Sequence, residues 1–349
     1  MAKPLMTTSR QASKTPRRAT ITDVARIADV APMTVSRVLT GSATVRPDKV
    51  TRIQEAMHLL RYKPNETARA LRSKRSKIIG LIVPRLSDSF FATIAHAVNN
   101  VAAENGYSVL IVTSNDEEES EYSQAQMMVL RGVEGIVIIP GEGYHSKLNR
   151  PEFEQISLVA LDKPIDEPSV DSVLVENAEG TRMAVEHLIE HGHKRIACIS
   201  EASGLFTLHK REEGYQHAMM DHDLKVQILT DCTTDRAHEM VRQLLSGKTP
   251  PTAIITTNGP ATRRVLRCLL ELRVKLPEQI ALISFDDFEF ADILEPSLTV
   301  VSQPVRELGR IAAMQMFNQL KEGRSQHVGK VTKLPVELVL RRSCGCNAR

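Results

Sequence analysis

Two adjacent carboxylates, Asp286 and Asp287, are of the residue type that general acid–base catalysis uses. No nucleophile or base at a recognisable spacing accompanies them in the 349-residue chain. The sequence also contains no GxGxxG, Walker A, GxSxG or HExxH motif. We therefore expect no catalytic residue, no cofactor and no enzymatic activity.

Histidines and cysteines raise the question of a metal site. His187, His191 and His193 have a spacing that superficially resembles that of metal ligands, but their context, VEHLIEHGHKRIA, predicts a helix end, a turn and a strand start. Cys344-Gly-Cys346 could bind a metal or oxidise, yet it lies near the chain end. The five cysteines are scattered and odd in number, which is typical of reduced thiols. We therefore expect no metal site.

Basic residues gather in the first 77 positions. That segment has 17 Lys and Arg residues against five Asp and Glu, a net charge of +12, which leaves −9 for the remainder. A basic end on an acidic body indicates a polyanionic partner at that end only. Residues 1–18 lack the apolar core of a secretory signal, and no apolar run could span a bilayer. We expect a disordered basic tail over 1–18, a cytoplasmic location and no membrane partner.

Two short helical patterns follow this tail. Thr22 is a suitable N-cap for the first helix, and Pro32 suits the first turn of the second. The second helix leaves Met33, Thr34 and Arg37 facing outward. Two short helices joined by a tight turn, the second with outward polar residues, are typical of a helix-turn-helix. A third helix over 47–60 supplies the floor of a three-helix core.

The segment PNETARALR, residues 64–72, comes next. Asn65 can cap a helix of barely two turns, which is marginal alone in water. Leu71 lies among basic residues with little apolar company. An apolar wedge beside cations suits insertion between base steps in a DNA minor groove. The alternative is a linker with an incidental leucine.

From Lys77 onward, apolar runs alternate with helical patterns such as 90–105 and 120–130. This alternation predicts an α/β class with two doubly wound lobes and a ligand-binding cleft outside the carboxyl ends of the strands. The runs rich in β-branched residues, which read as buried parallel strands, are 78–83, 108–112, 135–139, 156–161, 172–175, 195–200, 225–229, 252–256 and 280–285.

The whole series of motifs resembles the LacI/GalR (lactose-repressor-like) family of bacterial transcriptional regulators. The resemblance rests on TITDVARIADVAPMTVSRVL, RYKPNETARALRSKRSKIIGLIVP, GVEGIVIIP, ALISFDDF and LPVELVLRRSCGC, in family order. It implies a periplasmic-binding-protein-like body whose chain crosses between its lobes three times. The implied parts are a helix-turn-helix domain at 19–63, a hinge helix and linker at 64–76, an effector-binding and dimerisation domain at 77–342 (lobe one about 77–173 and 305–331, lobe two about 174–304 and 332–342), and a tail at 343–349.

The resemblance also implies which residues meet DNA. Arg37 is the best candidate for a bidentate contact with a guanine edge, and Leu71 falls at the family's intercalating leucine. Asp29 and Ala31 stand where the family usually has Gly and Ser. Asp can adopt the left-handed conformation that the turn needs, whereas Ala31 cannot cap the second helix. The implied DNA-binding residues are Thr22, Met33, Thr34, Ser36, Arg37, Asn65, Ala68, Arg69, Leu71 and Arg72.

A second set of residues is expected to line the cleft. Their carboxylates and amides can hold the hydroxyl groups of a sugar, which is the default effector. His209 stands where many sugar-responsive relatives carry an arginine, and Gly259 stands where relatives carry an aspartate, so an acidic effector would need Arg211 or Arg263. The expected cleft residues are Ser87, Phe90, Phe91, Asp162, His209, Arg211, Asn258 and Asp286.

Together these features predict a homodimer that binds a pseudo-palindromic double-stranded DNA operator, usually represses, and is modulated by a small molecule. Control by a protein partner or a non-sugar effector is the alternative. A more remote alternative is a sugar-binding protein or enzyme in which the helix-turn-helix domain is vestigial.

Overall fold

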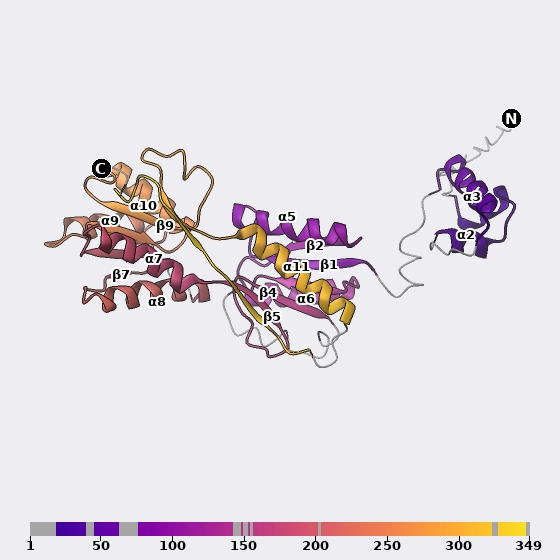
Figure 1. Cartoon of the computed structure of the whole chain (residues 1–349), viewed down its shortest axis with the longest axis horizontal. Coiled ribbons are helices and arrows are strands. Elements are labelled where there is room, and N and C mark those ends of the chain that lie inside the picture. The colour runs from indigo at the N-terminus through magenta and orange to yellow at the C-terminus, as the bar shows by residue number, and fades with distance from the viewer. Residues whose placement is uncertain are drawn as a thin grey trace, which may run out of the picture. The chain divides into compact units, whose positions relative to one another are not determined.

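The structure is a computed structural model that describes residues 19–39, 45–62, 76–141, 148, 153, 156–201, 204–322 and 327–346. The chain divides into two compact units, residues 1–75 and 76–349 (Figure 1). Among the described helices, none combines the length and the apolar character that a membrane crossing requires. The predictions for the tail and for the hinge residues Asn65, Ala68, Arg69, Leu71 and Arg72 lie outside the described residues.

The first unit contains three helices, α1 (Ile21–Ile27), α2 (Pro32–Leu39) and α3 (Pro47–Leu59). Thr20, not Thr22, caps α1, so that prediction was wrong. Thr20 accepts a hydrogen bond from Asp23 N, and the Asp23 carboxylate accepts one from Thr20 N at 2.9 Å, which makes a capping box. Thr22 is the exposed second residue of the helix.

The turn between α1 and α2 has the predicted form. Asp29 has φ +48°, the left-handed conformation that Asp tolerates, and α2 then begins at Pro32 as expected. Arg52 of α3 donates to the Asp29 carboxylate at 3.2 Å and so ties the turn to the third helix. Val24, Val35 and other buried apolar side chains from all three helices form one small core.

The first lobe of the second unit is a parallel six-stranded sheet in the order β11-β5-β4-β3-β1-β2. Helices α5 and α11 pack on one face and α6 on the other, so the strands are buried on both sides. The elements are β1 (Ile78–Val83), α5 (Ser89–Glu104), β2 (Ser108–Thr113), α6 (Glu118–Leu130), β3 (Gly135–Ile138), β4 (Ser157–Leu161), β5 (Asp171–Val175), α11 (Val305–Glu322) and β11 (Val331–Leu334).

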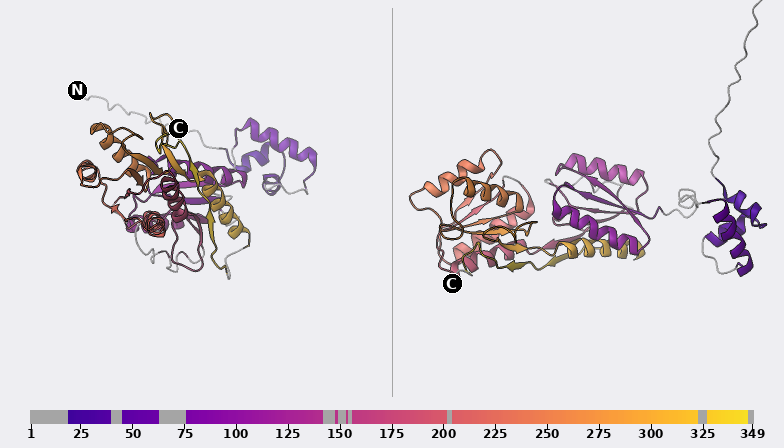
Figure 2. Two further views of the ribbon diagram at one scale, coloured as in Figure 1. Left: turned by 60° about the vertical axis from the view of Figure 1, so that its left-hand side comes forward. Right: turned by 90° about the horizontal axis from the view of Figure 1, so that it is seen from above.

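The second lobe repeats this plan with the strand order β12-β10-β9-β8-β6-β7, in which only β12 runs antiparallel to its neighbour. Helices α7 and α8 cover one face, and α9 and α10 the other (Figure 2). The elements are α7 (Asn177–Glu190), β6 (Ile196–Ile199), α8 (Phe206–Asp221), β7 (Ile228–Leu229), α9 (Ala237–Ser246), β8 (Ala253–Thr256), α10 (Gly259–Glu271), β9 (Ala281–Phe285), β10 (Thr299–Ser302) and β12 (Glu337–Val339).

The predicted α/β class with two doubly wound lobes is confirmed. The chain crosses between the lobes after β5, after β10 and after β11. The last crossing lies within the long yellow segment of Figure 1. The first lobe keeps its chain longer than expected, to Val175 and Leu334 instead of residues 173 and 331, because these two residues are partners in the β5–β11 ladder.

The end of the chain also differs from expectation. Ser343 was placed in a tail, but its side chain is fully buried and donates to Leu282 O at 2.6 Å. The same hydroxyl accepts from Thr299 N at 2.8 Å, and Leu282 N donates to Ser343 O at 2.9 Å. Residues 343–346 therefore continue the second lobe.

Candidate functional site

Helix α2 displays the side chains that were expected to reach DNA. Met33 is 54% exposed and Arg37 is also exposed, whereas Val35 on the opposite face is fully buried. Thr34 and Ser36 are half-buried at the edges of the exposed face. An arginine and short polar groups on an exposed helix suit hydrogen bonding to base edges and phosphates in a major groove.

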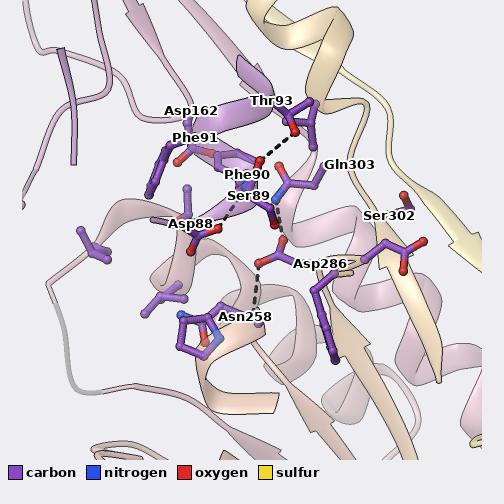
Figure 3. Close-up of a pocket in the computed structure, with 18 of the residues that line it drawn as sticks. Asp88, Ser89, Phe90, Phe91, Thr93, Asp162, Asn258, Asp286, Ser302 and Gln303 are labelled. Carbon is purple, nitrogen blue, oxygen red and sulfur yellow. Dashed lines mark hydrogen bonds between the residues drawn. The ribbon is translucent and has the colours of Figure 1, made fainter. Parts of the chain in front are cut away.

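A cavity of about 460 Å³ lies between the two lobes of the second unit (Figure 3). Loops at the carboxyl ends of strands in both sheets line it, together with the start of α5 and the segment that crosses into α11. This is the position at which doubly wound sheets place ligands. Polar residues that line it include Asp88, Asp116, Asp162, Lys163, Arg211, Asn258, Asp286 and Gln303.

Asp286, directly after β9, is the centre of a polar network on the second-lobe side. Its Oδ1 accepts a 2.6 Å hydrogen bond from Gln303 Nε2, as Figure 3 shows, and Oδ2 accepts from Gly259 N at 3.3 Å. Arg211 NH1 lies 3.6 Å from Oδ1. The carboxylate is therefore held in one orientation by groups from three different segments.

Arg211 is itself a buried cation with fixed partners. Its Nε donates to Asn177 Oδ1 and its NH1 to Thr257 O, both at 2.7 Å. The guanidinium carbon lies 3.7 Å from the centroid of the Phe285 ring. These contacts fix two of the five N–H donors of Arg211 on the protein and hold its charge beside Asp286, so Arg211 positions the Asp286 carboxylate.

On the first-lobe side, Asp162 follows β4 and is 6% exposed. Burial raises the pKa of its carboxyl, and the positive charges of Lys163 and Arg211 oppose that rise. Its Oδ1 has no hydrogen-bond partner within the described part of the chain, and the same holds for Gln303 Oε1. Two side chains that line the cavity thus each hold one buried acceptor that is unpaired within the described residues.

Apolar rings complete the wall. Phe90 and Phe91 meet edge to face with ring centroids 5.3 Å apart at the start of α5, where Asp88 Oδ1 accepts from Phe90 N at 3.0 Å and caps the helix. Phe288 lines the cavity from the second lobe. Apolar faces together with a few directed polar groups are typical of small-molecule sites.

Comparison with known proteins agrees with this architecture. Residues 20–65 match the family of bacterial regulatory proteins known as the lacI family, and residues 185–344 match the periplasmic binding protein-like domain. The ribose operon repressor of Halalkalibacterium halodurans is 30% identical over 306 residues, which are 87% of this chain and 91% of that protein. The chain belongs to the lacI family. It is a DNA-binding transcription regulator rather than an enzyme, as its relatives are.

Other members of the lacI family are similarly related. A probable transcriptional regulator, EndR, of Paenibacillus polymyxa is 31% identical over 314 residues, 88% of this chain and 92% of that protein. The crystal structure of a putative ribose operon repressor from Burkholderia thailandensis aligns with a TM-score of 0.69 at 30% identity, covering 76% of this chain and 99% of that one. The lac repressor dimer bound to operator and the anti-inducer ONPF shares the fold, with a TM-score of 0.82 at 24% identity over 94% and 99% of the chains.

Most of the residues expected in the cleft of this lacI-family regulator line the cavity, namely Phe90, Phe91, Asp162, Arg211, Asn258 and Asp286. Ser87 and His209 do not. The His209 side chain is 70% exposed and pairs with Glu213 at 3.1 Å on the outer face of α8. The helix turns Leu208 and Arg211, three residues apart, toward the cavity, and His209 between them points away. Arg211, and not His209, is therefore the positively charged side chain that α8 contributes to the cavity wall.

Asn258 lines the cavity with its side chain already bonded. Its Oδ1 accepts from Ala261 N at 2.9 Å as the N-cap of α10, and its Nδ2 donates to Glu201 Oε2 at 2.6 Å. At Gly259 a Cβ atom would lie 3.2 Å from Arg263 NH1, so the missing side chain leaves room for that arginine at the cavity edge.

Among the cavity residues that the sequence did not predict, Gln303 and Lys163 make polar contacts that shape the wall. Gln303 follows β10, a strand that had not been predicted, so nothing marked it as a residue at a carboxyl end. Lys163 directly follows the predicted Asp162 and lies 3.5 Å from Asp116 across the lobe. Its place next to a strand end was the available signal.

Proposed function

We propose that this lacI-family regulator acts in the cytoplasm as a homodimer that binds a pseudo-palindromic DNA operator and usually represses transcription. A neutral carbohydrate in the cavity between the lobes modulates its DNA binding. The observation that carries the effector class is the polar cavity lining, in which two acceptors, Asp162 Oδ1 and Gln303 Oε1, have no donor among the described residues.

Hydroxyl groups are the donors that suit these atoms. A carboxylate or phosphate on the ligand would bring further acceptors and negative charge toward Asp162 and Asp286. Arg211 offers such an anion little, because it is buried, donates hydrogen bonds to Asn177 and Thr257, and has its charge paired with the Asp286 carboxylate. A polyol with one apolar face can instead donate to the carboxylates and pack against the rings of Phe90 and Phe91.

DNA binding is assigned to the helix-turn-helix and to the hinge segment after it. Exposed Met33 and Arg37 on α2 support major-groove contact by the head. Two short hinge helices are each too marginal to persist alone, so we infer that they order against each other and the minor groove. A change in lobe closure that biases this ordering by roughly 1–3 kcal/mol alters operator occupancy from several-fold to a hundred-fold.

The alternative of control by a protein partner rested on His209 and Gly259. His209 lies outside the cavity, so its identity says little about whether a small molecule binds there. Gly259 contributes its backbone N–H to Asp286, and that contact needs no side chain.

A calorimetric screen of the full-length protein tests the effector class. The panel contains neutral pentoses, hexoses and disaccharides, their phosphates, and nucleobases. We expect specific binding of one neutral sugar, at least tenfold weaker in Asp286→Asn and unchanged in His209→Ala, which alters an exposed residue of the neighbouring helix. Binding of a phosphorylated sugar or a nucleobase alone would contradict the assignment.

A further inference from the structure

The last residues of the second lobe form a compact turn that brings two thiols together. Cys344 is 2% exposed and Cys346 is half-buried, and their sulfur atoms lie 2.8 Å apart. Gly345 between them has φ +79°, a conformation that glycine adopts without strain and that lets both sulfurs lie on one side. The buried hydrogen bonds of Ser343 fix the start of this turn on β9 and β10.

A histidine from a distant segment completes the cluster. A ring nitrogen of His187, near the end of α7, and the two sulfurs all lie within 4.8 Å of one another. His187 is 9% exposed, and its Nε2 is buried without a hydrogen-bond partner in the described ranges. The ring also forms a hydrogen bond with the Cys344 side chain, so a buried imidazole with one unpartnered nitrogen lies in direct contact with the thiol pair.

The other two histidines of this region have separate contacts. His191 stacks on His187 with ring centroids 4.4 Å apart, and its Nδ1 lies 2.7 Å from the carbonyl oxygen of His187. His193 Nδ1 lies 2.9 Å from Thr252 Oγ1. The histidine spacing in the sequence is thus not a ligand set, and His187 alone of the three faces the chain end.

We propose that His187, Cys344 and Cys346 form a binding site for a thiophilic divalent cation of the Zn²⁺ class. Two thiolates and one imidazole are the ligand types that Zn²⁺ prefers, and the partly exposed side of Cys346 leaves a fourth position for water. Binding displaces the two thiol protons to solvent and involves no change of oxidation state. This site goes beyond the proposed regulatory function and does not depend on it.

The geometry can accommodate such an ion with a small movement. Zn–S bonds of about 2.3 Å at tetrahedral angles place two sulfurs about 3.8 Å apart, so these sulfurs must separate by about 1 Å. Cys346 can supply that movement because its side chain is half-buried, whereas Cys344 is buried. The Thr299 hydroxyl donates to Cys344 Sγ at 3.2 Å, as groups around a metal-bound thiolate commonly do.

Titration of the full-length, metal-stripped and phosphine-reduced protein with Co²⁺ tests the site. We expect one equivalent of Co²⁺ to bind with a thiolate-to-cobalt charge-transfer band, and one equivalent of Zn²⁺ to remove that band. Zn²⁺ should also raise the melting temperature of the protein, since an ion that binds only the folded state stabilises it.

Matched variants locate the ion. Cys346→Ser alters a half-buried side chain and should weaken Co²⁺ binding at least tenfold and diminish the charge-transfer band. Cys268→Ser, at a cysteine of α10 outside the cluster, should leave both unchanged. Absence of the band in the reduced protein, or a band that survives in Cys346→Ser, would overturn the proposal. A protein that forms a Cys344–Cys346 disulfide when the phosphine is removed, but takes up no Co²⁺ when reduced, would overturn it as well.

Discussion

Gln303 Nε2 donates a 2.6 Å hydrogen bond to Asp286 Oδ1 at the point where the chain leaves the second lobe for α11. The bond joins the loop after β9 to the segment that crosses between the lobes, so one side chain connects two parts of the cavity wall. The Oε1 of the same amide is buried and has no hydrogen-bond partner within the described residues.

Gln303→Ala removes this bond and leaves the Asp286 carboxylate with Arg211 and Gly259. We expect the free energy of unfolding to fall by about 1–2 kcal/mol, because a hydrogen bond to a charged group is lost at a largely buried site. Chemical denaturation measures this. Gln243→Ala, which removes an exposed amide that bonds only within α9, should change stability by less than about 0.5 kcal/mol. Equal effects of the two substitutions would contradict the role of Gln303.

Asp162→Asn tests the buried carboxyl through pH. Because burial raises the folded-state pKa of Asp162 above 3.8, ionisation at neutral pH opposes folding. The Asn variant should therefore melt at a higher temperature than the wild type near pH 7. The gain should disappear as the pH falls to 3.8 and below, where the carboxyl is protonated in both the folded and the unfolded state. A lower melting temperature at pH 7 would mean that attraction by Lys163 and Arg211 outweighs burial.

Thr20→Ala removes the capping box of α1 and should destabilise the head by about 0.5–2 kcal/mol. Hydrogen exchange of the α1 amides in the full-length protein reports that loss directly. The matched control is Thr22→Ala, two residues further along the same helix, which removes an exposed hydroxyl that caps nothing. Slower hydrogen exchange of the α1 amides in Thr20→Ala than in Thr22→Ala would contradict the observed cap.

Arg37→Ala should weaken specific operator binding by about 1–3 kcal/mol and relax the base preference at one position of each half-site. Fluorescence anisotropy with the operator and with a scrambled duplex, at fixed salt, separates this loss from non-specific binding. Gln54→Ala, on the exposed side of α3, serves as the control. A uniform loss on both duplexes would assign Arg37 to a phosphate instead of a base.

The features that the sequence predicted correctly depend on the chemistry of single residues and their immediate neighbours. Asp29 was expected to hold the helix-turn-helix turn because Asp tolerates positive φ, and its φ of +48° confirms this. Asp162 and Asp286 follow buried strands, whose apolar composition is plain, and both line the cavity. Thr22 was predicted as the cap because threonine is a good N-cap residue, but the capping-box partner, Asp23, bonds to Thr20.

Contacts that depend on the packing of whole elements could not be predicted from the local sequence. His209 and Arg211 are two residues apart, and only the packing of α8 decides which of them faces the cavity. Gln303 was missed because β10 is a strand of four residues in the C-terminal part of the body. His187 and the Cys344–Cys346 pair lie more than 150 positions apart, so their meeting depends on the whole second lobe.

The proposed function is tested most directly by selecting binding sites from random duplex DNA with dialysed, ligand-free protein at a stated salt concentration. We expect an enriched pseudo-palindrome with a fixed, easily unstacked central step such as CG. Two helix-turn-helix domains of a dimer would each bind one half-site, and Leu71 would insert between the base pairs of the central step. Leu71→Ala should lose the preference at that central step while it keeps the half-sites. Enrichment of a single half-site without symmetry, or of no sequence at all, would contradict binding by a ligand-free dimer.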